Sequence, residues 1–448
     1  MNPKDVTLAE ASRFWCQLGL VSFGGPAGQI ALLHRELVER RHWLSERRYL
    51  HALNYCMLLP GPEATQLATY LGWLLHGVPG GLIAGGLFLL PSILVLTALA
   101  TVYALWGQLP LLASVFAVLK PAVLAIVVVA AWRLGQRILR TPLLVALAAL
   151  ALVSLAVLDV PYPLVVGLAA LIGWSAGRLR PHWIERQRDQ TVDNQQANQA
   201  VAPPALHDDL TPTPTHAQVS PRRLAMTMLF WGLATLLPLA GLVFWGGWNG
   251  TLATMARFFS RVALLSFGGA YAVLPYVAQG AVDTFGWLSA SQMVDGLALG
   301  ETTPGPLIMV VAFVGFMGGW NTGLDGDGSG AGGSWLAALS ATLVTVWFTF
   351  VPSFGFILAG APLVEASRDD LRLGAPLTGI SAAVVGVIAS LAVLFAGPVL
   401  LPAGRLEPAA LVVVALALLV QLRWRWSVMQ VIGAAAAAGV ALAAIRLL

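Results

Sequence analysis

Two short motifs place glycine and proline inside otherwise apolar stretches of this chain. The first, SFGGP, occupies residues 22–26, and the second, PGPE, occupies residues 60–63. Paired glycines and prolines interrupt a helix, so the next helix begins with backbone amides that have no intrahelical partner. Such free amides, together with the positive end of the helix dipole, bind anions. The motifs therefore predict backbone that can hold an anion.

Both motifs return later in the chain, 244 residues further on. SFGG recurs at 266–269 and PGP at 304–306, and the tripeptide WLS at 43–45 recurs at 287–289 without a gap in the register. Many transporters are built from duplicated halves, with the substrate site where the halves meet. Irregular backbone at membrane depth is tolerated only inside protein or around a wet cavity. The duplication thus predicts four broken helical elements that meet near the middle of the membrane.

Small residues also let membrane helices pack closely, and for a single copy of SFGG that would be the simpler interpretation. Two copies in one register, each followed by the same second motif, favour a binding site. Nearby hydroxyl groups would add hydrogen bonds to oxyanion oxygens, and Gln66 would serve either the substrate or a neighbouring helix. The predicted substrate-binding residues are Ser22, Gly24, Gly25, Pro26, Pro60, Gly61, Pro62, Gln66, Ser266, Gly268, Gly269, Thr302, Thr303, Pro304, Gly305 and Pro306.

Five charged residues in or beside these segments are candidates for coupling or for charge pairing. Glu63 and Glu301 flank the two PGP turns and are candidates for proton coupling, although water-exposed carboxylates at the membrane interface are equally consistent. Arg13 and Arg257 occupy matched positions and would either pair with a dianion or anchor their helices at the interface, the commoner role. Lys120 lies in mid-span as a buried counter-ion or a substrate contact.

The composition requires a membrane protein. Of 448 residues, 58% are hydrophobic and 10% are charged, with a mean hydropathy of +0.79; soluble domains carry about 25% charged residues. The lipid leaves helices as the spanning element, so we predict an all-α polytopic fold. Two cysteines form no disulfide framework, and neither they nor the seven histidines show metal-ligand spacing. No cofactor, no metal and no removable signal peptide are expected.

Nine runs with at most one charge are long enough, or nearly so, to cross a bilayer. They are separated by a polar segment at 181–221 that is rich in Gln, Asn, Asp, Thr and Pro and predicts a disordered cytoplasmic linker. We therefore divide the chain into an N-terminal membrane repeat (1–178), a linker (179–222) and a C-terminal membrane repeat (223–448). The runs are 82–105, 109–132, 142–158, 161–178, 224–247, 334–360, 376–397, 406–422 and 427–445.

Arginines indicate how the halves are oriented, because positive residues concentrate in cytoplasmic loops. They cluster at 133–140, at both ends of the linker, at 368–372 and at 423–425. With all these clusters inside, five crossings separate the two motif pairs, so the repeats have inverted topology. Nine spans and four motif elements give about 13 transmembrane or re-entrant elements, with a cytoplasmic N-terminus and an external C-terminus. The arginines at 35–48 fit only if the first element is re-entrant.

At these motifs the sequence resembles the chromate ion transporter family. The resemblance rests on SFGGP at 22–26, PGPEATQLA at 60–68 and their copies, and it covers 8–178 and 222–447. It implies long, two-domain members with 13 spans in inverted halves, and chromate efflux that gives a bacterium chromate resistance. One departure is Ala270, which stands where the first copy has Pro26, so the two sites need not be equivalent. The motif glycines and prolines at 24–26, 60–62, 268–269 and 304–306 carry over.

We therefore predict an exporter of chromate in the bacterial inner membrane. An inside-negative potential expels anions by about 2.3 kcal/mol per charge per 100 mV, so export needs no further energy source. The alternative is an importer of sulfate or another oxyanion, because sulfate has the same shape. Protons are a possible second partner, and nucleic acid is not a partner. An enzyme would need a His/Asp or Glu constellation on a loop, and a cation exporter would need carboxylates along several spans; the sequence has neither.

Overall fold

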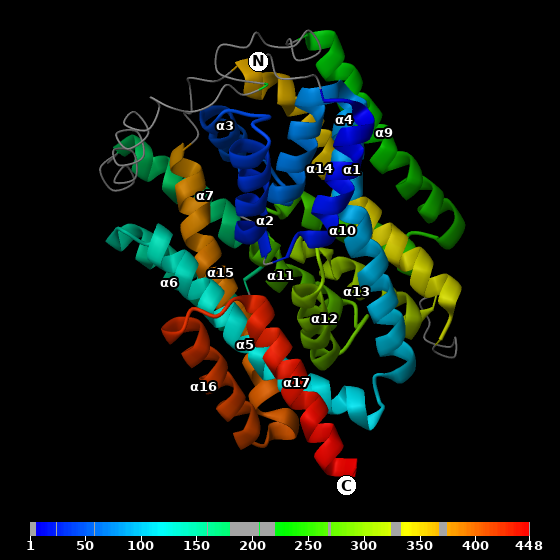
Figure 1. Cartoon of the computed structure of the whole chain (residues 1–448), viewed down its shortest axis with the longest axis vertical. Coiled ribbons are helices and arrows are strands. Elements are labelled where there is room, and N and C mark those ends of the chain that lie inside the picture. The colour runs from blue at the N-terminus through cyan, green and yellow to red at the C-terminus, as the bar shows by residue number, and fades with distance from the viewer. Residues whose placement is uncertain are drawn as a thin grey trace.

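The computed structural model describes residues 6–23, 25–57, 59–158, 160–179, 206, 220–267, 270–323, 333–366 and 374–447. These residues fold into helices joined by short turns, and the two chain ends lie at opposite ends of the long axis (Figure 1). The sequence-based prediction of an all-helical membrane protein is confirmed. Most of the predicted linker lies outside the described residues.

Each half contains two broken elements followed by long helices. The first half consists of α1 (Leu8–Val21), α2 (Gly25–His34), η1 (Arg35–Arg40), α3 (Glu46–Cys56), α4 (Glu63–Trp106), α5 (Pro110–Ile138), α6 (Pro142–Ala156) and α7 (Tyr162–Leu179). After α9 (Pro221–Gly246), the second half consists of α10 (Thr251–Leu265), α11 (Ala270–Ala278), η5 (Gln279–Thr284), α12 (Ala290–Thr302), η6 (Leu307–Met309), α13 (Val310–Thr322), α14 (Trp335–Ala366), α15 (Gly374–Leu400), η7 (Pro402–Gly404), α16 (Pro408–Arg423) and α17 (Val428–Leu447).

All nine predicted runs are helical. Among the described residues, seven helices are long and apolar enough to cross a membrane, namely α4, α5, α7, α9, α14, α15 and α17. The runs at 142–158 and 406–422 correspond to α6 and α16, which are apolar but shorter than 18 residues. The 44-residue α4 is two helices, because His76 and Gly77 leave helical geometry. Its first part continues the PGP motif and its second part is the predicted span at 82–105.

The duplication read from the sequence is visible in the backbone. One turn of π-helix occupies 35–40 in the first half and 279–284 in the second, which is the same 244-residue offset. Ser22 and Ser266 end their helices with nearly the same angles, φ −83°, ψ 75° and φ −79°, ψ 71°. Serine caps begin the matched helices: Ser45 Oγ accepts from Arg48 N in α3, and Ser289 forms a capping box in α12.

We call residues 8–76 the first motif unit and residues 251–322 the second motif unit. The long helices that follow them are exchanged between the halves: α15 packs on α6 and α7, and the matching α5 packs on α16 and α17. The second part of α4 also packs against α14, its counterpart. The two halves are therefore interlocked rather than side by side.

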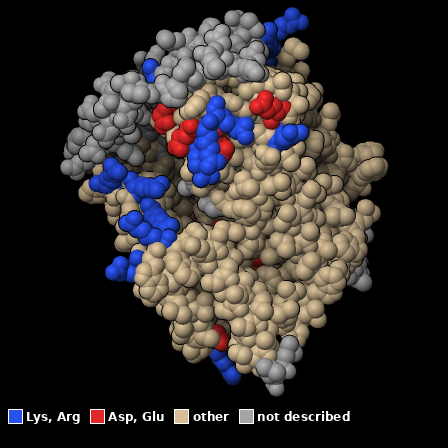
Figure 2. Space-filling model, viewed as in Figure 1, with Lys and Arg blue, Asp and Glu red and all other residues tan. Residues whose placement is uncertain are grey.

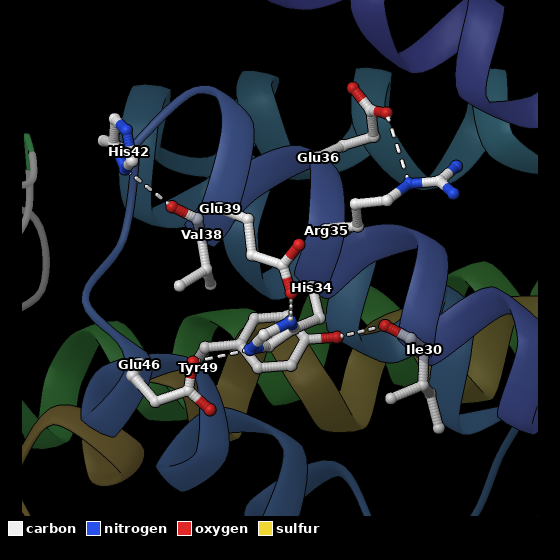
Figure 3. Close-up of polar contacts among 9 residues, drawn as sticks. All are labelled: Ile30, His34, Arg35, Glu36, Val38, Glu39, His42, Glu46 and Tyr49. Atoms are coloured by element: carbon white, nitrogen blue, oxygen red, sulfur yellow. Dashed lines mark hydrogen bonds and ion pairs between the residues drawn. The ribbon is translucent and has the colours of Figure 1, made fainter. Parts of the chain in front are cut away.

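Charged side chains gather in the upper part of the face seen in Figure 2 and along its left side, while the rest of that face is mostly uncharged. The turn from α2 to α3 belongs to this charged region (Figure 3). There His34 Nδ1 lies 3.1 Å from Glu39 Oε1 and its Nε2 contacts Glu46, while Arg40 pairs with Glu36 at 2.7 Å. These contacts join the end of α2 to η1 and to the start of α3. Neighbouring carboxylates therefore partly neutralise the positive charge of this turn.

Candidate functional site

The helices break where the motifs predict. In the first motif, α1 ends at Val21 and α2 begins at Gly25; in its copy, α10 ends at Leu265 and α11 begins at Ala270. Gly24, Gly268 and Gly269 lie outside the described residues. Pro26 occupies the first turn of α2, where its missing N–H is tolerated. Each break thus presents the start of a new helix.

The PGP motifs form the turns of the second broken elements. Pro62 is the N-cap of α4 and Pro306 is the N-cap of η6. Pro60 and Pro304 precede the turns, and the Pro60 carbonyl accepts a hydrogen bond from Gln66 Nε2 at 2.8 Å. The Gln66 side chain therefore contacts the PGP turn of its own half.

Two reciprocal hydrogen bonds join the four breaks. The Gly61 amide donates to the Ser266 carbonyl at 2.8 Å, and the Gly305 amide donates to the Ser22 carbonyl at 2.7 Å. The PGP turn of each half therefore meets the SFGG break of the other half. In Figure 1 the first motif unit (blue) and the second (green to yellow-green) approach each other near the middle of the molecule. The structure brings these sequence-predicted residues together at one place.

Two serines that the sequence analysis missed complete this junction. A Cβ on Gly305 would lie 2.6 Å from Ser92 Oγ, and a Cβ on Gly61 would overlap Ser353 Oγ. Gln66 Nε2 also donates to Ser353 Oγ at 3.1 Å. Ser92 and Ser353 both follow a proline inside a long helix, in α4 and α14. This repeated Pro-Ser pair was a usable signal, but additional residues between α13 and α14 displace it from the 244-residue register.

Several polar atoms at the junction are buried without a hydrogen-bond partner in the described part of the chain. Ser22 and Ser266 are both 0% exposed. Buried polar groups are normally hydrogen-bonded, so an unpaired cluster is a place where a ligand or water completes the bonding. The unpaired atoms are Ser22 Oγ, Ser266 Oγ, Ser92 Oγ, Thr65 Oγ1, Gln66 Oε1 and Gln29 Oε1. Gln29 belongs to the same place, because its Nε2 lies 3.4 Å from the Ser22 carbonyl.

The two threonines before the second PGP motif have their hydroxyl protons engaged elsewhere. Thr302 Oγ1 donates to the Leu299 carbonyl at 2.7 Å, and Thr303 Oγ1 donates to the Gly300 carbonyl at 3.0 Å. Such back-bonding to the preceding turn satisfies the hydroxyl within its own helix. Among the predicted hydroxyl donors, Ser22 and Ser266 are therefore the ones available to a ligand.

Of the five predicted charges, the two glutamates adjoin the PGP turns and the other three do not. Glu63 begins α4 directly after the first PGP turn, and the buried Glu301 accepts a hydrogen bond from Tyr271 Oη. Arg13 is exposed on α1, eight residues and about two helical turns before the break. Lys120 forms an ion pair with Asp295, Nζ to Oδ2 at 3.2 Å, which settles its partner in this structure. Asp295, an acid inside an apolar helix, was missed although an intramembrane carboxylate is itself a signal.

Arg257 anchors the start of α10. Its Nη2 donates to the Trp248 carbonyl at 2.7 Å, and its guanidinium lies 4.2 Å from the centre of the Trp248 ring. We expect Arg257→Gln to leave the apparent KM for substrate within about twofold, while protein stability falls by about 0.5–1 kcal/mol. Transport kinetics corrected for protein amount, beside a melting curve, check this. A tenfold rise in KM would place Arg257 in the substrate path instead.

The donors that the junction leaves free are neutral: the hydroxyl groups of Ser22, Ser266 and Ser92 and the backbone at the starts of the broken helices, while the Nε2 atoms of Gln29 and Gln66 already donate within the protein. No group of three or more His, Cys, Asp or Glu side chains suited to a metal ion occurs among the described residues. A site of hydroxyls and backbone amides binds an anion by hydrogen bonds and helix dipoles, without a fixed positive side chain. It suits a small oxyanion with several acceptor oxygens.

Comparisons with known proteins agree with this chemistry. A family model described as "Chromate transporter" matches residues 9–174 and 253–440, one match in each half. A chromate transport protein of Pseudomonas aeruginosa is 31% identical over 86% of this chain and 80% of its own length. A probable chromate transport protein of Synechococcus elongatus is 28% identical over 86% of this chain and 83% of its own length. No solved structure matches the chain significantly.

Proposed function

This chain belongs to the chromate transporter family, and from that membership we propose that it exports chromate from the bacterial cytoplasm across the inner membrane. It is a multi-pass membrane transporter of that family rather than an enzyme. The observation that carries the proposal is the pair of reciprocal hydrogen bonds between motifs, Gly61 to Ser266 and Gly305 to Ser22. They bring the broken helices of both halves around the unpaired serine hydroxyls.

The proposed topology has about 13 transmembrane or re-entrant elements in two inverted repeats. Three features support it. Each PGP turn bonds the SFGG break of the other half by the same hydrogen bond, as a two-fold relation between the halves requires. The chain ends lie at opposite ends of the molecule (Figure 1), as an odd number of crossings requires. The charged upper region in Figure 2 includes the turn from α2 to α3 of the first motif unit, and a concentration of positive residues there suits the cytoplasmic side.

The proposed substrate is a tetrahedral dianion, and chromate is the one that the family indicates. Four oxygens around one centre would accept hydrogen bonds from Ser22 and Ser266, which lie in the two halves, and from free amides at the starts of α2 and α11. Sulfate presents the same arrangement of acceptors, so the site would admit it as a competitor. Hydrogen bonds to a charged acceptor are stronger than neutral ones, which offsets the lack of a positive side chain.

The proposed direction is outward. A dianion that leaves an inside-negative cell gains about 4.6 kcal/mol at 100 mV, twice the value for one charge. Inward movement of the same dianion would need cations to travel with it. If protons take part in the cycle, Glu63 and Glu301 are the groups we propose for carrying them, because both adjoin a PGP turn.

Everted membrane vesicles test substrate and direction together. We expect respiring vesicles that contain the protein to accumulate labelled chromate, and excess sulfate to suppress the accumulation. Vesicles from cells with an empty vector provide the background. Accumulation that appears only in right-side-out vesicles would establish the importer instead. Absence of chromate flux in both orientations, with the protein present and folded, would remove chromate as the substrate.

A further inference from the structure

The two motif units are matched in sequence but differ in how deeply they are packed. Ala298 in α12 is 0% exposed, while Asn54, its counterpart in α3, is exposed. The same holds for Asp295, which is 2% exposed, against the half-buried His51. The second broken element is therefore buried in the second motif unit and partly open in the first.

The buried side chains repeat this difference. Those of the second motif unit belong to one large cluster that includes residues of α5, α7 and α15. Those of the first motif unit form a separate cluster with residues of α4 and α14, and this cluster includes no buried residue of α5 or α15. Within the described residues, the second motif unit is docked on the long helices that the halves exchange, and the first motif unit is not.

One polar network fastens the docked unit. Lys120 Nζ on α5 lies 3.2 Å from Asp295 Oδ2 and donates to Ser291 Oγ at 2.7 Å, both on α12. Tyr103 Oη on α4 donates to the same Asp295 oxygen at 2.8 Å. Ser291 and Asp295 are four residues apart, so they share one face of α12. The network therefore joins two helices of the first half to one helix of the second motif unit.

The first motif unit carries different residues at the matching positions. The positions that match Ser291 and Asp295 are Arg47 and His51. His51 Nε2 lies 2.9 Å from the Val364 carbonyl of α14, so it contacts a different helix. The asymmetry in packing thus coincides with a difference at the matched positions, where the docked side has Asp295 and the first motif unit has His51.

We propose that the Lys120–Asp295 pair, with Tyr103 and Ser291, is the latch that keeps the second motif unit closed, and that it must separate for the site to open on that unit's side. This rests on the proposed transport function. In inverted-repeat transporters the two sides open alternately as one repeat exchanges its arrangement with the other. In this structure the docked second motif unit would close the site toward the external side, while the first motif unit leaves the site open toward the cytoplasm. Asp295 is then a positioning residue, which acts on the gate and does not contact the substrate.

Removing one partner leaves a buried charge unpaired, which is strongly unfavourable in the docked arrangement. Asp295→Asn and Lys120→Met should therefore both shift the protein toward release of the second motif unit. Removing both charges, in Lys120→Met with Asp295→Leu, leaves no unpaired charge and should restore docking, because apolar pairs often replace buried ion pairs without loss. Asp283→Asn, an exposed acid on the same unit, is the matched control.

Thiol labelling at the two matched positions tests the latch. In a background with Cys16→Ser and Cys56→Ala, Ala298→Cys is labelled by an impermeant maleimide in intact cells and Asn54→Cys in everted vesicles. We expect Asp295→Asn to speed labelling at 298 by about tenfold and to slow it at 54, as a population shift requires. The double variant should return both rates to within about threefold of the parent, and Asp283→Asn should change neither.

Faster labelling at both positions would indicate general loosening and would overturn the latch, as would unchanged labelling at 298. The latch would also be contradicted if the double variant lost docking to the same extent as the single variants. The labelling needs no substrate, so a failure of the latch leaves the chromate proposal untouched. Conversely, absence of chromate flux in the vesicles would leave a positive labelling result standing as a property of the fold.

Discussion

Gly305→Ala is expected to abolish transport while the protein still reaches the membrane. Gly305 has φ +107°, a conformation that other residues adopt only with strain, and its added Cβ would lie 2.6 Å from both Cβ and Oγ of Ser92. The substitution would also disturb the amide that donates to the Ser22 carbonyl. Strain on the order of 3 kcal/mol at this junction corresponds to a fall in flux of about 100-fold. Chromate uptake into everted vesicles measures it.

Gly61→Ala should behave in the same way, because Gly61 has φ +135° and its Cβ would overlap Ser353 Oγ. Gly86→Ala is the control: it lies in the same long helix as Ser92, and a Cβ there meets nothing within 4 Å. Transport above half of the parent value in either Gly61→Ala or Gly305→Ala would show that the crossed junction is not needed for transport.

Ser22→Ala and Ser266→Ala are expected to weaken substrate binding without destabilising the protein. Both hydroxyl oxygens are buried and have no hydrogen-bond partner among the described residues, so their removal breaks no bond of the fold there. A hydrogen bond to a charged ligand is worth about 1.5–3 kcal/mol, so each substitution should raise the apparent KM for chromate by about 10- to 100-fold. Initial rates of uptake over a range of chromate concentrations measure this.

Ser12→Ala is a matched control on α1, since Ser12 Oγ donates to the Leu8 carbonyl and is remote from the break. It should leave the KM unchanged. If Ser22→Ala and Ser266→Ala kept the parent KM, the hydroxyls would not contact the substrate. The backbone amides of α2 and α11 would then be the remaining ligands of the site.

Hydropathy and helix-breaking residues were enough to predict most of the fold. The long apolar runs became helices because lipid leaves the backbone no other way to satisfy its amides. The breaks at SFGG and PGP followed from glycine and proline geometry, and a constant offset identified matched residues. The sequence could not say which motifs touch, because an offset reports equivalence and not contact. That the Gly61 amide bonds the Ser266 carbonyl of the other half required the structure.

The site was predicted less completely than the fold, for identifiable reasons. Ser92 and Ser353 were missed because additional residues between α13 and α14 shift their register, although each follows a proline in a long helix. The matched arginines were predicted either to pair with the dianion or to anchor their helices, and the contact of Arg257 with the Trp248 ring favours an anchor at that position. Matched positions in a repeat can thus preserve an anchor as readily as a ligand. Asp295 was overlooked because it lies outside the repeated motifs.

Equilibrium binding to the purified protein tests most directly whether the crossed motifs hold the oxyanion. Labelled chromate would be titrated by dialysis against the parent protein and against the Ser22→Ala/Ser266→Ala double variant, with unlabelled sulfate as competitor. We predict one dianion per chain for the parent, displaced by sulfate, and no measurable binding at the same concentrations for a double variant whose melting temperature is unchanged. Equal binding by both proteins would contradict the assignment of the substrate site to this junction.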